Sequence, residues 1–329
     1  MGLIKFALSG NYLHFIKEIN ILSKKINKPS FILFVDMIFS TILVGSGLSD
    51  YLNYRFYKKT FKEKKEYVTI GYQAKFYKKV CSLKYADFFS NKINFNKNFK
   101  KYTKRDFFET SQGLESLSKF VLKHKNFVIK PIVGLGGTDV SEVNFNEIGN
   151  LGKFYKKLKD KGFFLEEKIK QHSEWARLSP RSINTIRVMT RIIKGRPDLF
   201  FAVARVGSGK FLTDNFHKGG LAILVDLNTG TLKGNGITKN LQKYEVSPIT
   251  GVKFDSFKIP FWEETKKIVI DAAFVNTKVA VVGWDIAISQ NGPIIVEGNR
   301  GPGFDIVQVV LGRGAKYMLD IINLKEFER

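Results

Sequence analysis

Two carboxylates and an amide near the C-terminus are the side chains of this sequence best placed to do chemistry. Asp285 precedes a turn signal, and Glu297 and Asn299 follow it, all within the otherwise apolar stretch 279–300. Because Glu297 and Asn299 are two residues apart, they share one face of a strand. Carboxylate and amide oxygens are the ligands that Mg²⁺ prefers, together with water and phosphate oxygens. The three residues therefore predict a magnesium site; the alternative is that they cap strand ends at the surface.

A hairpin turn would bring these side chains together. Asn291-Gly292 between two apolar runs is a strong hairpin signal. We expect a three-residue loop over 290–292, with its glycine in the left-handed conformation, so that Ser289 faces Pro293. Counting four residues back along each strand then sets the two carboxylates directly opposite each other.

A lysine followed by a glycine-rich loop forms the second candidate site. Lys130 ends the apolar run 127–130, and Gly134, Gly136 and Gly137 follow it. Glycines allow backbone N–H groups to approach phosphate oxygens closely. The loop is not a Walker loop, because no Lys-Ser/Thr pair follows it, and Asp139 replaces the third glycine of a dinucleotide fingerprint. It predicts a phosphate contact, with an ordinary turn as the alternative.

The segment FFLEEKIKQHSE suits an adenosine. Its strand ends in Glu166, Glu167, Lys168 and Ile169, and Glu174 follows seven residues after Glu167. Backbone groups near Lys168 and Ile169 would read the adenine edge, and a carboxylate would accept from the ribose hydroxyls. The alternative is a solvated, Glu-rich strand end.

Polar residues of two later loops are the candidates for contacting a substrate. Asn215, His217 and Lys218 lie on a loop that we expect at the phosphate end, and Arg300 follows the predicted metal ligands. Plain turn residues are the alternative for His217 and Arg300.

These residues need a scaffold of mixed helices and strands. Apolar residues at spacings of three and four predict helices between 12 and 66. Beyond residue 125 the pattern predicts strands at 127–131 and 163–167, hairpins pairing 184–192 with 198–206 and 220–226 with 231–235, and helices at 150–161, 262–275 and from Asp305 onward. Because strands and helices do not alternate regularly, the expected class is α+β.

Composition and charge exclude several classes of protein. The 329 residues contain one cysteine, Cys81, which excludes a disulfide scaffold and a thiolate metal cluster. There are 54 Lys and Arg against 30 Asp and Glu, a net charge of +24, and residues 1–125 carry +15 of it. Such an excess fits an anionic membrane surface, nucleic acid, acidic substrates, or compositional drift.

The N-terminal third contains the only long apolar run. Residues 31–48 are interrupted by one charge, Asp36, and are too short and too polar for a typical membrane span of about 20 apolar residues. We expect a buried or interfacial helix. Lysines alternate with aromatic residues between Phe56 and Lys79, which fits either a membrane-facing surface or a solvated helix face. The expected location is cytoplasmic, with peripheral membrane contact as an additional possibility.

The order of these motifs resembles the ATP-grasp superfamily. Lysine, glycine loop, Glu-Glu strand, arginine-bearing strand and Asp…Glu-x-Asn follow one another in that family's order. More narrowly, SINTIRVMT, TDNFHKGG, DLNTGTL and GWDIAI…GPIIVEGN are similar to the sugar-transfer-associated ATP-grasp proteins of polysaccharide biosynthesis. The resemblance, over about residues 31–310, implies an ATP-grasp fold of two α+β subdomains gripping ATP. A basic, mainly helical region at 1–85 would precede the catalytic domain at 86–329.

The resemblance also implies roles for the candidate residues. Lys92 and Lys130 would contact the α- and β-phosphates, with Lys97, Lys100 or Lys101 replacing Lys92 if the register slips. The glycine loop would cover the β- and γ-phosphates. Residues 166–169 would line the adenine site, with Glu167 and Glu174 as ribose ligands.

Arginines and metal ligands would act on the transferred phosphoryl group. Arg187 and Arg205 would be aimed at that group, and Asp285, Glu297 and Asn299 would hold two Mg²⁺ ions, for which Mn²⁺ could substitute.

The activity implied by the resemblance is amide formation by an ATP-dependent carboxylate–amine ligase. Its partners would be a small-molecule acid and amine, a sugar acid or an amino acid. A kinase on the same scaffold and a catalytically silent ATP-binding scaffold of a glycan assembly complex are the alternatives. Nucleic acid is not expected as a partner, because the chain lacks a compact recognition motif.

Overall fold

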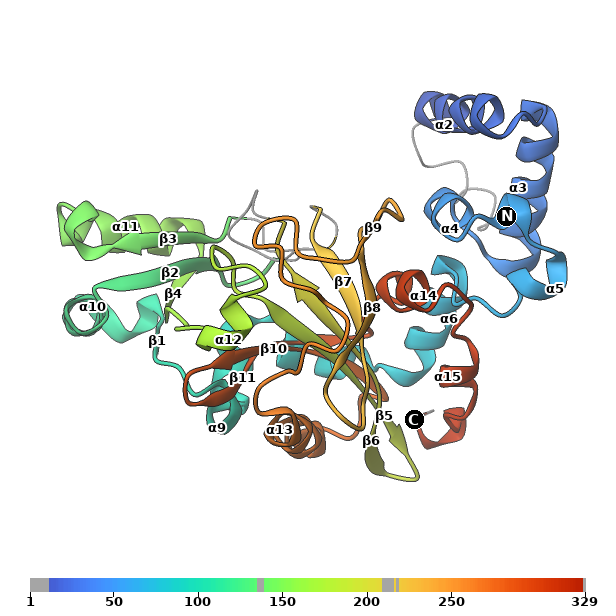
Figure 1. Ribbon diagram of the computed structural model, residues 1–329. Helices are drawn as coiled ribbons and strands as arrows, with labels where there is room; N and C mark the ends of the chain where they lie inside the picture. Colours follow the sequence, from blue (N-terminus) through green and yellow to red (C-terminus); the bar gives the residue numbers. More distant parts are fainter. Residues whose placement is uncertain (1–11, 135–138, 209–215, 217–218, 328–329) are drawn as a thin grey trace.

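The chain folds around two antiparallel sheets with helices packed against them (Figure 1). The computed structural model describes residues 12–134, 139–208, 216 and 219–327. A four-stranded sheet has the strand order β1-β4-β2-β3, and a seven-stranded sheet has the order β11-β10-β5-β6-β7-β8-β9. Neighbouring strands run antiparallel throughout the described residues. This architecture confirms the predicted α+β class.

The four-stranded sheet and two helices share a small core of their own. Its elements are β1 (Phe107–Phe108), β2 (Asn126–Pro131), β3 (Ser141–Asn144), β4 (Phe163–Glu167), α10 (Gly113–Lys123) and α11 (Leu151–Lys161). The apolar stripes of both helices bury Leu117 and Leu158 in the same cluster as Phe127 of β2. Asn150 caps the start of α11 by accepting the Lys153 N–H at 2.9 Å. The predicted strands 127–131 and 163–167 and the predicted helix 150–161 are confirmed.

The seven-stranded sheet is built from hairpins. Its strands are β5 (Thr185–Ile193), β6 (Arg196–Val206), β7 (Leu221–Val225), β8 (Leu232–Ile237), β9 (Lys243–Tyr244), β10 (Val281–Ser289) and β11 (Gly292–Arg300). The β5–β6 turn consists of Lys194 and Gly195, whose φ angles are +50° and +75°. A two-residue turn with positive φ at both positions suits the twist of antiparallel strands. The predicted hairpins are therefore confirmed.

Helices from the second half of the chain complete the packing of this sheet. They are α12 (Ser173–Ala176), α13 (Trp262–Val275), α14 (Asp305–Leu311), α15 (Tyr317–Asp320) and the 3₁₀ helix η6 (Leu324–Glu326). In α13, Ile268, Val269 and Ala272 recur at helical spacing and are buried in the main core. The predicted helix 262–275 and the predicted helix start at Asp305 are confirmed.

The helices that precede the first sheet begin, with α2 to α5, at the end of the molecule opposite α10 and α11 (Figure 1). They are α2 (Tyr12–Ile26), α3 (Ser30–Val44), α4 (Leu48–Asn53), η1 (Phe56–Lys58), α5 (Phe61–Lys64), α6 (Ile70–Val80), η2 (Leu83–Tyr85), α7 (Ala86–Ser90), α8 (Lys92–Asn98) and α9 (Lys100–Thr103), with η3 (Thr110–Gln112) and η4 (Phe145–Glu147) further along the chain. Helices over 12–66 were expected, and the structure has them.

Most of the apolar stretch 31–48 is helix α3, and only its last residue, Leu48, belongs to the next helix, α4. Helix α3 ends at Val44 because Gly45 adopts a left-handed conformation, with φ +67°. The one charge in the stretch, Asp36, is neutralised by Lys64 at 2.6 Å and accepts the Tyr51 hydroxyl at 2.8 Å. Packing of the helix against the rest of the chain thus supplies the partner that a lone carboxylate would lack.

The N-terminal helices are continuous with the main core. Tyr54, Phe56 and Tyr67 are buried in the same cluster as Trp284 of β10. The Gln308 side chain of α14 accepts the Val68 N–H at 2.7 Å and donates to the Val68 carbonyl at 3.1 Å. The division of the chain at residues 85 and 86 stays a prediction.

Candidate functional site

A cleft of about 620 Å³ is lined by residues of both sheets. One wall comes from the four-stranded sheet and the segments that flank it, with Lys92, Lys130, Gly134, Glu166, Glu167, Lys168 and Ile169. The other wall comes from the seven-stranded sheet, with Arg187, Arg205, Asp285, Glu297 and Asn299. Twelve residues singled out from the sequence thus line one cavity, although they are spread over more than 200 positions.

Strand register aligns the charged groups of the second wall. Asp285 pairs with Glu297 across β10 and β11, and with Arg187 across β10 and β5. Directly opposed residues of an antiparallel pair project from the same face of the sheet. A carboxylate, a second carboxylate and a guanidinium therefore stand in one row over three strands.

The hairpin has the predicted opposition of the two carboxylates, but its turn differs from the predicted one. Its turn has two residues, Gln290 and Asn291, and Ser289 pairs with Gly292 instead of Pro293. The three-residue loop was therefore wrong. A register shift between Asp285 and Ile286 adds one residue to β11 and restores the opposition of the two carboxylates.

Two arginines hold Asp285 ionised. The Arg187 Nη2 donates to its carboxylate at 2.9 Å, the Arg187 Nε donates to the other oxygen, and the Arg205 Nη1 donates at 2.9 Å. Burial alone would raise the pKa of Asp285, but the two guanidiniums outweigh it and hold that pKa well below its usual range.

The environment of Glu297 shifts its pKa in the opposite direction. Burial raises its pKa, and the neighbouring Asp285 charge raises it further. The Asn299 Nδ2 donates to Glu297 Oε1 at 3.2 Å. Two adjacent carboxylates, Asp285 buried and Glu297 half-buried, with an amide beside them favour a cation, because a cation would relieve their mutual repulsion. This set of hard oxygen donors fits Mg²⁺.

Glu166 joins three side chains on the first wall. Its Oε2 lies 2.8 Å from Arg105 Nη1 and 2.5 Å from Lys130 Nζ, and its Oε1 accepts from Asn96 Nδ2 at 2.8 Å. Burial would raise the pKa of Glu166, but Arg105 and Lys130 lower it to about 2. The carboxylate orients Lys130 and leaves its own oxygens occupied by protein donors.

Arg105 also connects the two walls. Its Nη2 donates to the carbonyls of Ile295 at 3.3 Å and Val296 at 3.2 Å, both on β11. Val296 is the residue added by the register shift, so its carbonyl is free of the regular ladder. Neither Arg105 nor Asn96 was singled out from the sequence, because each is one polar residue among many in a Lys- and Asn-rich stretch.

Lys92 lies beside the start of the glycine loop. Its Nζ donates to the Gly134 carbonyl at 2.9 Å, and its N–H donates to the Ile132 carbonyl at 3.0 Å. Asn91 caps helix α8 by accepting from the N–H groups of Ile93 and Asn94. Burial lowers the pKa of Lys92. Gly136 and Gly137 lie outside the described residues.

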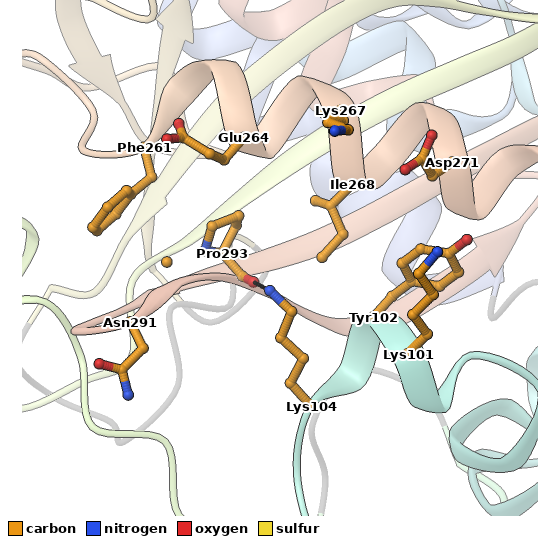
Figure 2. A pocket seen from close by; sticks show the side chains of 11 residues that line it. Lys101, Tyr102, Lys104, Phe261, Glu264, Lys267, Ile268, Asp271, Asn291 and Pro293 are labelled. Carbon is orange, nitrogen blue, oxygen red and sulfur yellow. Dashed lines mark hydrogen bonds between the residues drawn. The ribbon is translucent and has the colours of Figure 1, made fainter.

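The lysines considered as substitutes for Lys92 do not line the cleft. Lys97 pairs with Glu109 at 2.5 Å. Lys101 lines a separate pocket of about 360 Å³ between α9, α13 and the β10–β11 turn, together with Lys104 and Lys267 (Figure 2). Two carboxylates, Glu264 and Asp271, line the same pocket, so its charges are mixed.

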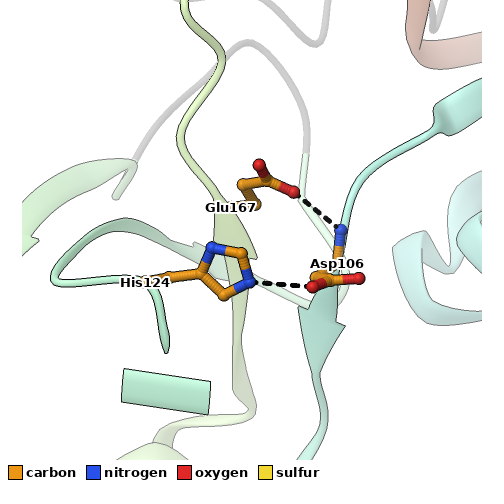
Figure 3. A group of neighbouring side chains, drawn as sticks. All are labelled: Asp106, His124 and Glu167. Carbon is orange, nitrogen blue, oxygen red and sulfur yellow. Dashed lines mark hydrogen bonds and ion pairs between the residues drawn. The ribbon is translucent and has the colours of Figure 1, made fainter. Parts of the chain in front are cut away.

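Residues 166–169 of the predicted adenosine segment line the cleft, and the charged side chains of Lys168 and Glu167 have protein partners there. Lys168 forms an ion pair with Glu142 at the cleft edge. Glu167 accepts the Asp106 N–H at 3.2 Å and belongs to a group with Asp106 and His124 (Figure 3). Lys123 pairs with Asp106 Oδ2 at 2.5 Å, so one of the two carboxylates of that group already has a cationic partner.

Two predicted residues lie outside the cleft lining. Glu174 is exposed and pairs with Arg177 at 2.7 Å. Arg300 donates to the Cys81 carbonyl at 2.6 Å, which gives its guanidinium a structural partner. Asn215, His217 and Lys218 lie outside the described residues. Lining residues that the sequence did not suggest include Arg181, whose side chain is exposed.

A cleft between two antiparallel α+β units, with lysines on one wall and carboxylates on the other, defines an ATP-grasp fold. The chain belongs to the sugar-transfer-associated ATP-grasp family, whose model matches residues 53–323.

Solved structures with a similar fold include several ligases. The ATP-grasp ligase PsnB, complexed with precursor peptide PsnA2 and AMPPNP, is 12% identical, with a TM-score of 0.42 over 75% of this chain and 61% of that chain. D-alanyl-alanine synthetase A from Vibrio cholerae O1 biovar eltor is 9% identical, with a TM-score of 0.44 over 75% and 67%. D-cycloserine synthetase DcsG is 9% identical, with a TM-score of 0.40 over 71% and 72%. The chain spans between 58% and 62% of the PsnB chains. No curated protein sequence matches the chain significantly.

Proposed function

We propose that this protein is an ATP-dependent carboxylate–amine ligase. The observation that carries the proposal is the cleft in which Lys92 and Lys130 of one wall face Asp285, Glu297 and Asn299 of the other. Cations on one side and cation ligands on the other suit a triphosphate, which needs its charge neutralised along its whole length.

The chain's own residues would hold and orient the nucleotide. Lys92 and Lys130 would neutralise phosphate oxygens, and Glu166 would fix the position of Lys130. Arg187 and Arg205 would face the transferred phosphoryl group. Asp285, Glu297 and Asn299 would hold Mg²⁺, and the ion would neutralise further phosphate charge. A solved structure of PsnB contains Mg together with ADP.

The chemistry would proceed in two steps. An oxygen of the substrate carboxylate would attack the γ-phosphorus, the bond to the β,γ-bridging oxygen would break, and ADP would leave. An amine would then attack the carbonyl carbon of the acyl phosphate, phosphate would leave, and the nitrogen would lose a proton. No enzyme nucleophile is required, and the described residues contribute charge and orientation.

The substrates would be a sugar acid or an amino acid used in cell-surface polysaccharide biosynthesis. The family's association with sugar transfer supports this class. Arg181 adds an exposed guanidinium to the cleft wall, and a guanidinium pairs well with a planar carboxylate. We assign Arg181 to the carboxylate of the acid or amine substrate.

The test is ADP release by the purified protein against a matrix of uronic acids and amino acids. A ligase forms ADP in step with amide, and only when acid and amine are both present. ADP formation without an amine acceptor would indicate a kinase, and ATP binding without turnover would indicate a scaffold.

Glu297→Gln checks the metal assignment. We expect ADP formation to fall by a factor of about 100 or more, because the variant removes one of the two carboxylate ligands. Folding should be retained, since burial and Asp285 make the Glu297 charge unfavourable in the protein alone. Glu174→Gln is the matched control and should remain active, because Glu174 is exposed and outside the cleft. Near-normal turnover of Glu297→Gln would refute the metal site.

A further inference from the structure

Helix α3 has an apolar face that nothing in the described residues covers. Its exposed side chains lie within one arc of about 140° at 100° per residue. They are Phe31 (74% exposed), Ile32 (56%), Ile38 (38%), Phe39 (56%), Ile42 (57%) and Leu43 (54%). The opposite face buries Leu33, Met37 and Ser40.

This pattern differs from that of an ordinary surface helix. A surface helix of a globular protein turns charged and polar residues toward water. Every residue in the exposed arc of α3 is apolar, and Asp36, at its border, is paired with Lys64. Helix α3 packs on α2, α4, η1 and α5, so that, among the described residues, only its outer face is left for a partner.

Basic residues surround the apolar face along the chain. Lys24 and Lys25 end helix α2, and Lys28 lies three residues before Phe31. The elements η1 and α5, which pack against α3, contribute Lys58 and the exposed Lys62. Residues 12–85 contain fourteen Lys and Arg against five Asp and Glu.

We propose that the outer face of α3 docks on the surface of an anionic lipid bilayer. Apolar side chains would enter the headgroup and acyl boundary, while the surrounding lysines would contact anionic headgroups. Among the described residues, no single helix has the length and hydropathy of a membrane span, and α2 and α3 reach them only together, as a pair bent by 119°. The proposal goes beyond the ligase activity and does not depend on it.

Charge favours a bilayer over a second copy of the chain. In a two-fold dimer through this face, the lysines of one copy would approach the same lysines of the other. An anionic surface instead complements them and accepts the exposed phenylalanines and isoleucines.

The test is co-sedimentation of the full chain with vesicles. We expect binding to vesicles of phosphatidylcholine mixed with phosphatidylglycerol, little binding to phosphatidylcholine alone, and weaker binding at high salt. Phe39→Glu should reduce binding by about tenfold or more, because it places a charge within the inserted face. Phe274→Glu is the matched control: Phe274 is 54% exposed, similar to Phe39, but lies near the end of α13. It should bind as the unaltered chain does.

Other outcomes overturn the proposal. Absence of binding to the mixed vesicles, or equal losses in both variants, would refute membrane docking. A dimer in sedimentation velocity that Phe39→Glu dissociates would assign the face to a second copy. If the chain bound vesicles only after removal of residues 1–11, the partner of the apolar face in the intact chain would be that segment and not a membrane. Ile42→Ser repeats the test if Phe39→Glu unfolds, and thermal unfolding of each variant reports on the fold.

Discussion

Replacing Glu166 by glutamine should destabilise the protein strongly. Glu166 is buried and accepts from Asn96, Arg105 and Lys130. Glutamine preserves the shape of the side chain but removes its charge, so Arg105, with 3% of its side chain exposed, loses its anionic partner inside the protein. Removing one partner of a buried ion pair is costly because the other charge stays buried without compensation.

The size of the effect follows from the pKa of Glu166. In the folded protein this pKa is about 2, against an ordinary value of 4.5. At about 1.4 kcal/mol per pH unit, the difference corresponds to about 3 kcal/mol of folding free energy at neutral pH. Mutations that break buried ion pairs cost about 3–5 kcal/mol, which agrees. Because the folded state has the lower pKa, the contribution is complete above about pH 4.5 and disappears as the pH falls to about 2.

Chemical denaturation monitored by circular dichroism measures this quantity. At pH 7 we expect Glu166→Gln to lower the free energy of unfolding by about 3 kcal/mol, and the gap to the unaltered chain to narrow below about pH 4.5. Glu142→Gln is the matched control, because the Glu142–Lys168 pair is 34% and 45% exposed and should contribute less than about 1 kcal/mol. Equal effects of the two variants, or a loss below about 1 kcal/mol for Glu166→Gln, would refute the reasoning.

Two further substitutions test the nucleotide site and the N-terminal packing. Lys92→Ala should weaken ATP binding, measured by calorimetry, by about tenfold or more. Lys97→Ala is the control and should leave ATP binding unchanged, because Lys97 lies outside the cleft. If both variants bound ATP equally well, Lys92 would not belong to the nucleotide site. Gly71→Ala should lower the free energy of unfolding by about 1–3 kcal/mol, because the added Cβ would lie 2.7 Å from the Gly45 carbonyl oxygen. Gly152→Ala is the control: the nearest contact of its added Cβ would be at 3.4 Å, and it should stabilise α11 slightly. If the Gly71→Ala variant were as stable as the Gly152→Ala variant, the close approach of Gly71 to Gly45 would be contradicted.

Short-range signals in the sequence predicted the elements well. Helical spacing marked α13, and the turn residues marked the hairpins of the larger sheet. The opposition of Asp285 and Glu297 was also predicted, but through a three-residue loop that the structure does not have. The two-residue turn moves the strand register by one residue, and the register shift within the strands moves it back. Alternation of apolar residues alone encodes neither the length of the loop nor the presence of a bulge.

The partners of the charged side chains could not be predicted. Asn96 and Arg105 meet Glu166 across 70 and 61 residues of chain. No local pattern connects residues so far apart, and nothing in the local sequence distinguishes one lysine or asparagine of a basic stretch from its neighbours of the same type. Likewise, Glu174 has the spacing of a ribose ligand, but the structure leaves it exposed beside Arg177.

The sequence by itself determined the types of residue available and the local elements that carry them, because turns and apolar periodicity act over a few residues. The tertiary structure decided which charges meet and which apolar surfaces stay exposed. The sequence predicts a buried or interfacial helix within residues 31–48, yet only packing shows that α3 buries Leu33 and Met37 and leaves Phe31 and Phe39 exposed. Burial and ion pairing depend on distances in space, and segments far apart in the chain set those distances.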